Sequence, residues 1–553
     1  MKKLIIILLA TLLLTGCAIF DEPTPDVEKE PDSGIVDDEK GEQKPDDGEQ
    51  KPDDGEQKPD DGEQKPDDTE QGDKDDIRQI SISDYIISLG DSLYANDKDF
   101  LSFAASLDQR SVGKVIYASP DGSEDGEGTI DSPLSIYEAI DAARAGDTVY
   151  LRGGEYIFTE AIWLSRSGKA GSYITVKSYP GESARLTTTP ENVAKYDEDG
   201  EYLFFGFDAG VGYWIFEDLE IYGATDEYVA AFACYDGGQN HLIFKNNRIH
   251  DLKTTYLEGG ANAFLFLGEK KNSINNILVI GNECYDLVLG YSEAVSFAGN
   301  CEYCYVIDNT VRDVTNIGID FYGNAGYCGT ASLDQARYSV AAYNTVYNCN
   351  SPYADCAGIY VDGGKFCLIE GNLIYNCQYG IEIGSEEKQD SYPVTDIVVV
   401  NNICKENSVC ALRIGGYDTK TSGVVKSCTV ANNSFIGTKG EFDVIISMVD
   451  GIVFANNLFA SDASAVETEF STSYIKNISF ISNLFDTEEE LELFGKEMTA
   501  DRLNGEYGSG NIVADVLLDG YAQTNGAQGS AEYMPKYDFY RYERDDCLIG
   551  AVE

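Results

Sequence analysis

Two stretches of the chain, 429-TVANNSFIG-437 and 452-IVFANNLFA-460, share one form: a short β-type run that ends in a polar turn built around asparagine. Similar runs recur from about residue 205 onward, and their asparagines return every 24 to 35 residues. These asparagines are Asn247, Asn282, Asn309, Asn344, Asn372, Asn402, Asn433, Asn457 and Asn483. Such a period is typical of a solenoid, in which short units stack on one another.

The composition of the runs indicates what kind of solenoid this is. They are short, rich in Val, Ile and Tyr, and punctuated by Gly and Asn, so they do not fit a helical repeat. Asparagine tolerates left-handed backbone geometry and can bond a stacked copy of itself one coil away. The sequence therefore predicts stacked β coils, with the shortest interval as the bare coil and loops inserted in the longer ones.

The first 112 residues differ from the rest. Residues 1–17, MKKLIIILLATLLLTGC, have the lysines, the apolar run and the final Leu-Thr-Gly-Cys of a bacterial export signal, and they resemble a lipoprotein signal whose Cys17 becomes lipidated. Residues 18–76 carry four GEQKPDD copies and predict a disordered acidic tether. Residues 77–112 predict a short helical or linker region, and 113–553 the β domain. We expect a protein anchored at the outer surface of a bacterial cell membrane.

The charge and the metal-binding residue types limit the partners. The formal net charge is −56, which disfavours nucleic acid and would repel a polyanion unless a cation intervened. Only two histidines are present, and the cysteines lack zinc-type spacing, so a zinc site is not expected. We expect a monomer whose cysteines are mostly small buried residues.

Four similar segments raise the question of function: 317-IGIDFYGN-324, 357-AGIYVDGG-364, 379-YGIEIGSEEK-388 and 410-CALRIGGYD-418. Side chains alternate between the two faces of a strand, so the apolar members fit the inside of a coil. The members between them then form one column on the solvent side of the sheet. That column contains Asp320, Tyr360, Glu382 and Arg413, preceded by Ser296.

A groove is predicted beside this column. Glycines at the strand ends remove bulk there, and the inserts 323–338 and 384–395 could form its walls. Tyr322, Tyr360 and Lys365 are the predicted substrate-binding residues, because aromatic faces pack well on sugar rings. A polysaccharide is the predicted partner.

Three functions fit such a groove. β-Elimination from a uronic acid needs a base and a cation, with Arg413 as base or substrate clamp. Ca²⁺ would be the cation, because it prefers several oxygen ligands. The predicted calcium ligands are Asp320, Asp362, Glu382 and Glu386.

Hydrolysis of a glycoside instead needs two carboxyl groups, here Glu382 with Asp362 or Asp320. Arg413 would then keep Glu382 ionised, and Tyr360 would assist. The third function is non-catalytic binding of glycans at the cell surface. We favour a lyase, with a hydrolase as the next alternative.

The chain also resembles the right-handed parallel β-helices of pectate lyases and their relatives. The resemblance lies in residues 115–156, in 172-SYITVKSYPGE-182 and in the final 547-CLIGAVE-553, read as a closing strand. It implies an all-β, single-stranded right-handed parallel β-helix. Ser135 and Glu138 form a capping box, and the helix that follows is expected to cover the open N-terminal end of the solenoid.

Within that group the sequence looks most like the family 9 pectate lyases. Their base lies in a Gly-Phe-Lys-Leu-Gly-Gly type of segment, matched here by Ala411-Leu412-Arg413-Ile414-Gly415-Gly416, with Arg413 in place of the lysine. Their Asp-Asp-Gly-Phe-Asp calcium cluster has no full counterpart, and the nearest segment is 356-CAGIY-360. The resemblance implies elimination on a pectate-like polysaccharide with Ca²⁺ as cofactor.

Overall fold

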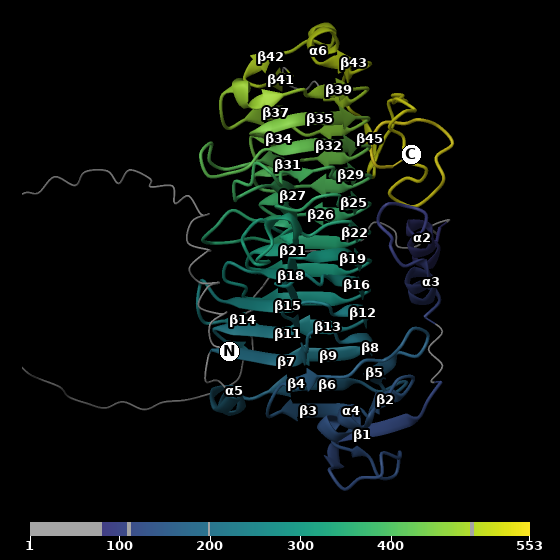
Figure 1. Ribbon diagram of the computed structural model, residues 1–553. Coiled ribbons are helices and arrows are strands. Elements are labelled where there is room, and N and C mark those ends of the chain that lie inside the picture. The colour runs from purple at the N-terminus through teal and green to yellow at the C-terminus, as the bar shows by residue number, and fades with distance from the viewer. Residues whose placement is uncertain (1–79, 108–111, 197–199, 487–490, 553) are drawn as a thin grey trace, which may run out of the picture. The chain divides into compact units, whose positions relative to one another are not determined.

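The computed structural model describes residues 80–107, 112–196, 200–486 and 491–552. The predicted signal peptide, Cys17 and the tether lie outside the described residues. From residue 115 onward the chain winds into a stack of β coils (Figure 1). Each complete coil contributes one strand to each of three long sheets, so consecutive coils pair in parallel. The predicted solenoid is confirmed.

The first sheet contains 16 strands. They are β1 (Val115–Ser123), β2 (Thr148–Leu151), β5 (Ile174–Ser178), β8 (Gly212–Glu217), β12 (Asn240–Lys245), β16 (Ile274–Ile280), β19 (Cys301–Ile307), β22 (Val340–Ala342), β25 (Leu368–Glu370), β28 (Val394–Thr395), β29 (Val398–Val400), β32 (Val425–Ala431), β35 (Val449–Ala455), β38 (Ile475–Lys476), β39 (Ser479–Ile481) and β43 (Gly508–Ser509).

The second sheet has 13 strands and carries the candidate site. They are β4 (Ile162–Leu164), β7 (Glu201–Phe207), β11 (Tyr228–Cys234), β15 (Gly260–Gly268), β18 (Glu293–Gly299), β21 (Ile317–Tyr322), β24 (Ala357–Asp362), β27 (Tyr379–Gly384), β31 (Cys410–Gly415), β34 (Phe442–Ile446), β37 (Ser464–Thr468), β41 (Glu492–Leu493) and β42 (Lys496–Glu497).

The third sheet also has 13 strands. They are β3 (Gly154–Phe158), β6 (Ala184–Thr188), β9 (Leu219–Tyr222), β13 (Arg248–His250), β17 (Glu283–Leu287), β20 (Thr310–Val314), β23 (Thr345–Cys349), β26 (Leu373–Tyr375), β30 (Ile403–Lys405), β33 (Ser434–Ile436), β36 (Leu458–Ala460), β40 (Leu484–Phe485) and β44 (Ile512–Val513). Two small pairs lie outside the three sheets: β10 (Thr225–Asp226) with β14 (Lys253–Thr254), and β45 (Leu518–Asp519) with β46 (Ala522–Gln523).

A continuous apolar core fills the inside of the coils. Matching residues of successive coils stack on one another, as in the parallel rings of Phe205, Phe232 and Phe264. Of the 13 cysteines after Cys17, twelve are buried, as predicted, and Cys547 is partly exposed. No disulfide joins two of these cysteines within the described residues. Close packing of the stacked rows, rather than disulfide bonds, therefore holds the described coils together.

The turn between the first and third sheets contains a ladder of asparagines. In each copy, Oδ1 accepts hydrogen bonds from the backbone N and the side-chain Nδ2 of the preceding copy, as Asn372 does from Asn344 at 2.9 and 3.0 Å. The residue before each ladder asparagine has positive φ, for example Asn401 at 58° and Asn432 at 53°. The predicted bonding between coils is confirmed, and the ladder continues one step further, to Asn511.

Helix α4 (Ile136–Ala142) lies at the N-terminal end of the stack, as predicted (Figure 1). Ser135 caps it by accepting a hydrogen bond from the backbone N of Glu138 at 3.2 Å. Ile136 and Ile140 are buried in the main core, so this end of the core is covered. The predicted closing strand over 547–553 is wrong: 548–552 holds no strand, and its backbone bonds side chains and turns of other coils, as Ala551 N does to Ser434 Oγ. A short apolar run specifies burial but not a partner strand.

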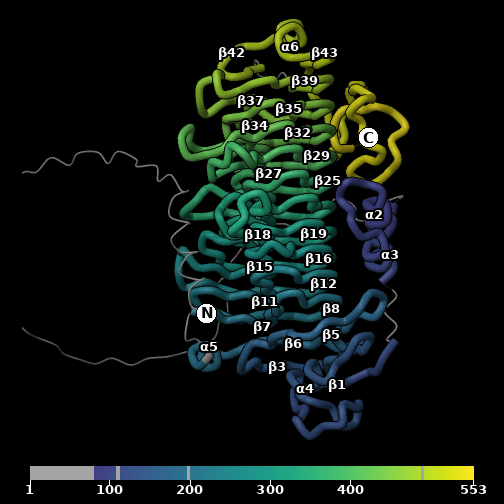
Figure 2. Tube along the Cα trace, viewed as in Figure 1, coloured from purple at the N-terminus to yellow at the C-terminus, as the bar shows by residue number. Residues whose placement is uncertain are grey.

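Four other α-helices and two 3₁₀ turns lie in the described residues. The α-helices are α2 (Ile82–Leu89), α3 (Lys98–Ser106), α5 (Pro190–Tyr196) and α6 (Ala500–Glu506), and the 3₁₀ turns are Ala331–Leu333 and Thr472–Tyr474. Helices α2 and α3 lie in the stretch predicted as a short helical or linker region, and they pack against the outer face of the first sheet, on the same flank as the C-terminal segment (Figure 2). In the described part of the chain, no helix is both long and apolar enough to cross a bilayer.

Candidate functional site

One column of outward positions runs along the second sheet, and we call it the central file. Backbone pairing places Ser296 beside Asp320, Asp320 beside Tyr360, Tyr360 beside Glu382 and Glu382 beside Arg413. The alternating apolar residues Ile319, Ile359, Ile381 and Leu412 lie in the main core. The predicted register is therefore confirmed.

The same pairing extends the central file toward the N-terminus. Trp163, Gly206, Ala233 and Leu265 precede Ser296, one residue per coil. We call Trp163 to Ser296 the open half of the file and Asp320 to Arg413 the closed half. The two halves differ in what lies beside them, although Ala233 and Ser296 of the open half are themselves only 0% and 2% exposed.

The closed half does not face solvent, contrary to the prediction. Asp320 and Tyr360 are each 2% exposed, Glu382 is 0% and Arg413 is 1%. The inserts 323–338 and 384–395 contact each other and the sheet here: Gln335 Nε2 donates to the carbonyls of Gly363 and Tyr392, and the backbone N of Glu386 donates to Asp362 Oδ1 at 3.1 Å. The inserts predicted as walls thus cover this half.

Arg413 is held from several sides. Its Nη1 lies 2.8 Å from Glu382 Oε1, its Nη2 lies 2.6 Å from Glu469 Oε2, and its guanidinium stacks 3.9 Å from the centre of the Tyr417 ring. Burial acts to lower its pKa, but Tyr417, Glu382 and Glu469 raise the pKa well above the usual range. A guanidinium in this setting stays protonated, so Arg413 is a poor base at neutral pH.

The carboxyl groups of the closed half favour their neutral forms. Burial raises the pKa of Asp320 well above its usual range, and the charges of Glu293 and Asp362 add to this. The pKa of Asp362 is raised by burial and by Glu386. Burial, followed by the charge of Glu382, raises the pKa of Glu386 to about 8. For Glu382, burial also raises the pKa, while Arg413 opposes the rise.

The calcium ligand set can be tested against this geometry. Asp320 Oδ1 and Glu382 Oε2 are buried and accept no hydrogen bond from any described residue. Two such oxygens fall short of the six to eight that Ca²⁺ takes. Across the described ranges, no three His, Cys, Asp or Glu side chains are grouped so that they could hold a metal ion. The four predicted ligands, as they are placed, do not fit a calcium ion. Ca²⁺ dependence stays a prediction.

Lys365 lies apart from the central file. It follows the Gly363-Gly364 turn, next to the first sheet. Its backbone forms isolated parallel β-bridges with Arg337 and Thr395 of the neighbouring coils. Burial and the charge of Arg337 lower its pKa. Tyr322, the other predicted substrate-binding residue outside the file, lies at the edge of an open cleft.

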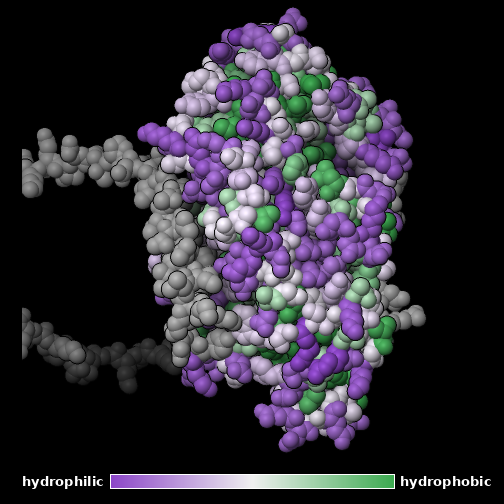
Figure 3. Space-filling model, in the orientation of Figure 1, coloured by the Kyte–Doolittle hydropathy of each residue, from purple (hydrophilic) through white to green (hydrophobic). Residues whose placement is uncertain are grey.

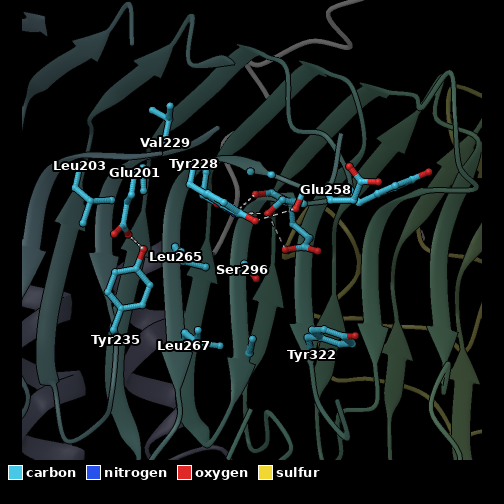
Figure 4. A pocket seen from close by; sticks show the side chains of 18 of the residues that line it. Glu201, Leu203, Tyr228, Val229, Tyr235, Glu258, Leu265, Leu267, Ser296 and Tyr322 are labelled. Carbon is cyan, nitrogen blue, oxygen red and sulfur yellow. Dashed lines mark hydrogen bonds between the residues drawn. The ribbon is translucent and has the colours of Figure 1, made fainter. Parts of the chain in front are cut away.

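That cleft lies beside Leu265 and Ser296, the last two members of the open half (Figure 4). The cleft encloses about 790 Å³ when the open space at its mouth is counted. Leu203, Ala230, Leu265, Leu267 and Ala298 contribute its apolar part. Tyrosines and carboxyl groups surround this floor. They are Tyr228, Tyr235, Tyr291, Tyr322, Tyr327, Glu201, Glu258 and Glu293.

Glu293 begins β18 and is partly buried in the cleft wall. Burial raises its pKa to about 7, while hydrogen bonds with the Ser296 and Ser292 hydroxyls act to lower it. Its backbone carbonyl accepts a hydrogen bond from Asn262 Nδ2 at 2.6 Å, and Asn262 Nδ2 also donates to Ser292 Oγ at 2.9 Å. The backbone of Glu293 is therefore held in place, and burial favours the protonated form of its carboxyl group.

Glu293 was not among the predicted site residues, because strict alternation from Ser296 would direct its side chain into the coil. Glu293 and Ser296 are three positions apart, yet their side chains hydrogen-bond each other. The same spacing recurs in the next coils, where Ile317, Ala357, Tyr379 and Cys410 pack on the outer face with Tyr360 rather than in the main core. An acidic residue three positions before a file member, as in 292-SEAVS-296, was the available signal.

The charge of the cleft is one-sided. Its lining includes three glutamates, and none of the described lining residues is Lys, Arg or His. The face of the molecule shown in Figure 3 is mostly hydrophilic with small separate apolar patches. A neutral ligand with hydroxyl groups and apolar faces fits this lining better than an anionic one does.

Comparison with known proteins identifies relatives. The family model "Pel9A-like, right handed beta helix region" matches residues 116–288. The chain is 33% identical to the uncharacterized protein YwoF of Bacillus subtilis (strain 168) over 358 residues, which are 63% of this chain and 74% of YwoF. It is 44% identical to pectate lyase PEL9 of Emericella nidulans over 124 residues, 21% of this chain and 30% of PEL9.

The crystal structure of pectate lyase Pel9A matches with a TM-score of 0.37 and 13% identity, over 80% of this chain and 97% of that chain. The residues matched by the family model end at 288, before Glu293 and the closed half of the file. The match to PEL9 covers less than a third of that protein. On the family model, the YwoF match and the stacked parallel coils, the chain belongs to the pectin-lyase-like right-handed β-helix proteins.

Proposed function

We propose that the protein is a carbohydrate-active enzyme that hydrolyses a neutral polysaccharide in the open cleft. The observation that carries this proposal is the lining of the cleft: a carboxyl group with a pKa of about 7 stands among other carboxylates, tyrosines and an apolar floor, with no basic residue in the described lining. Glycoside hydrolysis requires two carboxyl groups in different protonation states.

Glu293 is the proposed general acid. Its pKa is raised to about 7, so the carboxyl group is protonated in a large share of the protein molecules at neutral pH. A protonated Glu293 can donate to the glycosidic oxygen as the bond to the sugar breaks. The hydroxyls of Ser292 and Ser296 stabilise the carboxylate that remains.

Glu258 is the proposed second carboxyl group. It lies in the loop that leads into β15, and β15 pairs directly with β18, which carries Glu293. Neighbouring strands lie about 4.8 Å apart. Both glutamates line the cleft, although the register of the two strands places Asn262, four residues after Glu258, beside Glu293. The two carboxyl groups of glycosidases lie about 5 to 9.5 Å apart, and the proposal requires this separation between Glu258 and Glu293. Glu201 is on β7, three coils from β18, about 14 Å away by the same spacing.

β-Elimination on a uronic-acid polysaccharide is the second candidate, because the curated relative PEL9 is named a pectate lyase. It needs a base and neutralisation of the substrate carboxylate. Arg413 is buried in two ion pairs, and the cleft lining offers a uronate three glutamates. These features favour hydrolysis of a neutral glycan over elimination.

The deciding experiment incubates the purified full chain, carrying Cys17→Ser, with neutral xylan, polygalacturonate and alginate. New reducing ends on the neutral polymer without ultraviolet absorbance of unsaturated uronates support hydrolysis. Absorbance that appears on a uronate polymer and disappears with a chelator would establish elimination and calcium dependence instead. Binding without cleavage of any polymer would identify a non-catalytic glycan-binding protein.

Variants locate the activity. Glu293→Gln should lower the rate by a factor on the order of 10² to 10⁴, the usual contribution of a general acid. Glu258→Gln should have an effect of similar size. Glu283→Gln is the matched control, because Glu283 lies at the start of β17 in the third sheet and pairs with Arg248 and Arg312 outside the cleft. Full activity in Glu293→Gln would overturn the assignment.

For the location, we propose that the mature chain is anchored to the outer face of a bacterial membrane by a lipid on Cys17, acting as a monomer. The support is the lipoprotein-type signal over residues 1–17. Replacing Cys17 by serine should shift the protein from the membrane fraction to the medium. Unchanged membrane association of that variant would contradict the proposal.

A further inference from the structure

Glu293 lies near one end of the cleft, not at its middle. On the N-terminal side of Glu293, the lining includes residues of β15, β11 and β7, the three strands that precede β18 in the second sheet. On the C-terminal side, Tyr322 and Tyr327 are the only described lining residues that follow β18. Glu201 and Tyr322 lie at opposite ends of the lining (Figure 4). Since successive coils lie about 4.8 Å apart, the lining extends about 14 Å to one side of Glu293 and about 5 Å to the other.

Two tyrosines form a wall at the short side, and we call Tyr322 and Tyr327 the end wall. Their rings pack edge to face with centres 5.5 Å apart. Tyr327 belongs to the insert 323–338, which lies directly against β18, because a Cβ on Gly299 would lie 3.1 Å from Tyr327 Cβ. Burial raises the pKa of the Tyr327 hydroxyl, and the charge of Glu293 is the next largest cause. The ring of Tyr327 is therefore close to the carboxyl group of Glu293.

The insert 323–338 is fixed by buried hydrogen bonds. Asp334 is 2% exposed, and its carboxyl group accepts from the backbone N of Gly326 at 2.6 Å and from that of Cys328 at 2.7 Å. These two donors are the residues on either side of the end-wall tyrosine of the insert. Gln335, which is 0% exposed, donates through Nε2 to a backbone carbonyl of the next coil at 2.7 Å. The end wall is therefore part of the folded scaffold.

The sheet behind the end wall is covered. Asp320 and Tyr360 are each 2% exposed, and Asp362 is 3% exposed. The backbone N of Glu386, from the second insert, donates to Asp362 Oδ1 at 3.1 Å and holds that insert on the sheet. A polymer that lies along the cleft cannot continue over the closed half. It therefore ends within about one coil of Glu293.

We propose that the cleft accepts only a terminus of a neutral polysaccharide, and that Tyr327 in the end wall determines this specificity. A coil step is close to the length of a sugar residue, so about one or two sugars fit between Glu293 and the end wall. Cleavage beside Glu293 then releases short products from a chain end. This inference rests on the proposed function for the cleavage itself, whereas the need for a free terminus is a statement about binding.

The cleavage step consumes one water molecule per bond. Glu293 gives its proton to the glycosidic oxygen, which leaves with the pair of electrons of the broken bond. The hydroxyl of water adds to the anomeric carbon, and the remaining proton of that water passes to Glu258. Transfer of this proton back to Glu293 through solvent restores both carboxyl groups.

The first experiment compares cleavage at chain ends with cleavage inside the polymer. The full chain with Cys17→Ser is incubated with neutral xylan while reducing ends and viscosity are measured together. Reducing ends should increase with little loss of viscosity, and mono- and disaccharides should be the main early products. An early loss of viscosity with long products would overturn the closed end of the cleft and leave the proposed hydrolysis intact.

The second experiment measures binding without cleavage, with Glu293→Gln added to the same chain. Calorimetry compares free xylohexaose with xylohexaose that carries a bulky aryl group at its reducing or at its non-reducing end. One of the two blocked forms should bind at least tenfold more weakly than the free form. Equal affinity for all three forms, or binding of none, would overturn the inference. A requirement for one free end, combined with no cleavage by the chain that keeps Glu293, would refute the proposed hydrolysis alone.

Variants of the insert test the role of Tyr327. Tyr327→Ala removes part of the end wall, so the products should lengthen by about one sugar and the blocked xylohexaose should regain affinity several-fold. Tyr338→Ala is the matched control, because Tyr338 ends the same insert but stacks between Tyr303 and Phe366, outside the cleft lining. Its products should equal those of the parent chain. Unchanged products in Tyr327→Ala, or an equal shift in both variants, would overturn the assignment of Tyr327.

Discussion

The two halves of the central file share a strand position, a sheet and a register, yet their surroundings differ. From Trp163 to Ser296 the file is uncharged, and its last two members, Leu265 and Ser296, line a cleft. From Asp320 to Arg413 it is polar or charged and lies beneath two inserts; these residues are at most 2% exposed, as Ala233 and Ser296 also are. The difference arises from the inserts after β21 and β27, which lie over the closed half. A column of catalytic residue types is therefore no sufficient sign of an active site, because loops from other coils decide whether a ligand reaches it.

The largest expected effect comes from breaking the buried ion pairs of the closed half. Arg413→Met leaves Glu382 buried without its cation, which should reduce the free energy of unfolding by about 4 kcal/mol. Urea denaturation measures this loss. The folded fraction should still cleave substrate at the parent rate, since the open half is unchanged. Arg502→Met, at an exposed pair with Glu506, is the control and should leave stability unchanged.

A parent-like stability of Arg413→Met would show that the buried ion pairs of Arg413 do not stabilise the fold. Loss of cleavage in fully folded Arg413→Met would instead return this residue to the active site, as the sequence alone predicted.

The asparagine ladder sharpens the comparison, because its polar column is also buried but its amides are fully bonded. Asn372→Ala removes the acceptor for Asn344 N and Nδ2 and the donor to the Ala341 carbonyl. Leaving these buried groups without partners should cost about 3 kcal/mol of unfolding free energy. Chemical denaturation provides the measurement. Asn477→Ala, an exposed left-handed asparagine, serves as the control, and equal losses in both variants would contradict a special role of the ladder.

The acids of the closed half predict how stability depends on pH. Their pKa values are raised in the folded state, so folding favours their protonated forms, and this stabilisation is present at low pH and lost as pH rises through the folded values. For Glu386 the window runs from its ordinary pKa of 4.5 to about 8. The free energy of unfolding should fall across that window, by up to about 1.4 kcal/mol for each pH unit.

Denaturation at several pH values tests this dependence. Glu386→Gln should flatten the curve, because its amide cannot ionise. A stability that rises between pH 5 and pH 8 in the parent chain would contradict the burial of neutral acids in the closed half.

The smallest effect concerns another covered face. Tyr85 of α2 donates a hydrogen bond to Glu370 Oε2 at 2.8 Å on the first sheet. Tyr85→Phe should destabilise the protein by about 1 kcal/mol, the usual net value of such a bond. Thermal unfolding measures it, with Ile87→Ala on the exposed side of α2 as control. An unchanged midpoint in Tyr85→Phe would show that this bond does not hold the helices to the sheet.

The repeating features, namely the coils and the register of the central file, could be predicted from the sequence. Features that depend on individual loops could not. The asparagine period was sufficient to predict the coils, because each ladder residue bonds its copy in the next coil. The register of Asp320, Tyr360, Glu382 and Arg413 followed from alternation around those turns.

The burial of these four residues could not be predicted from alternation, because it depends on where the inserts fold. Glu293 escaped because outward side chains recur three positions apart as well as two. In each case a tertiary contact, rather than a local pattern, determined the role of the residue.

The ladder also separates the scaffold from the loops. Asn433 and Asn457 are 24 residues apart and Asn309 and Asn344 are 35 apart, yet each interval advances the chain by one coil. Extra residues are accommodated outside the sheets and leave the stacking unchanged. A lineage built on this scaffold can therefore uncover or seal different coils by insertion and deletion alone. Descendants that share every ladder position can then differ in which stretch of the same column meets a substrate.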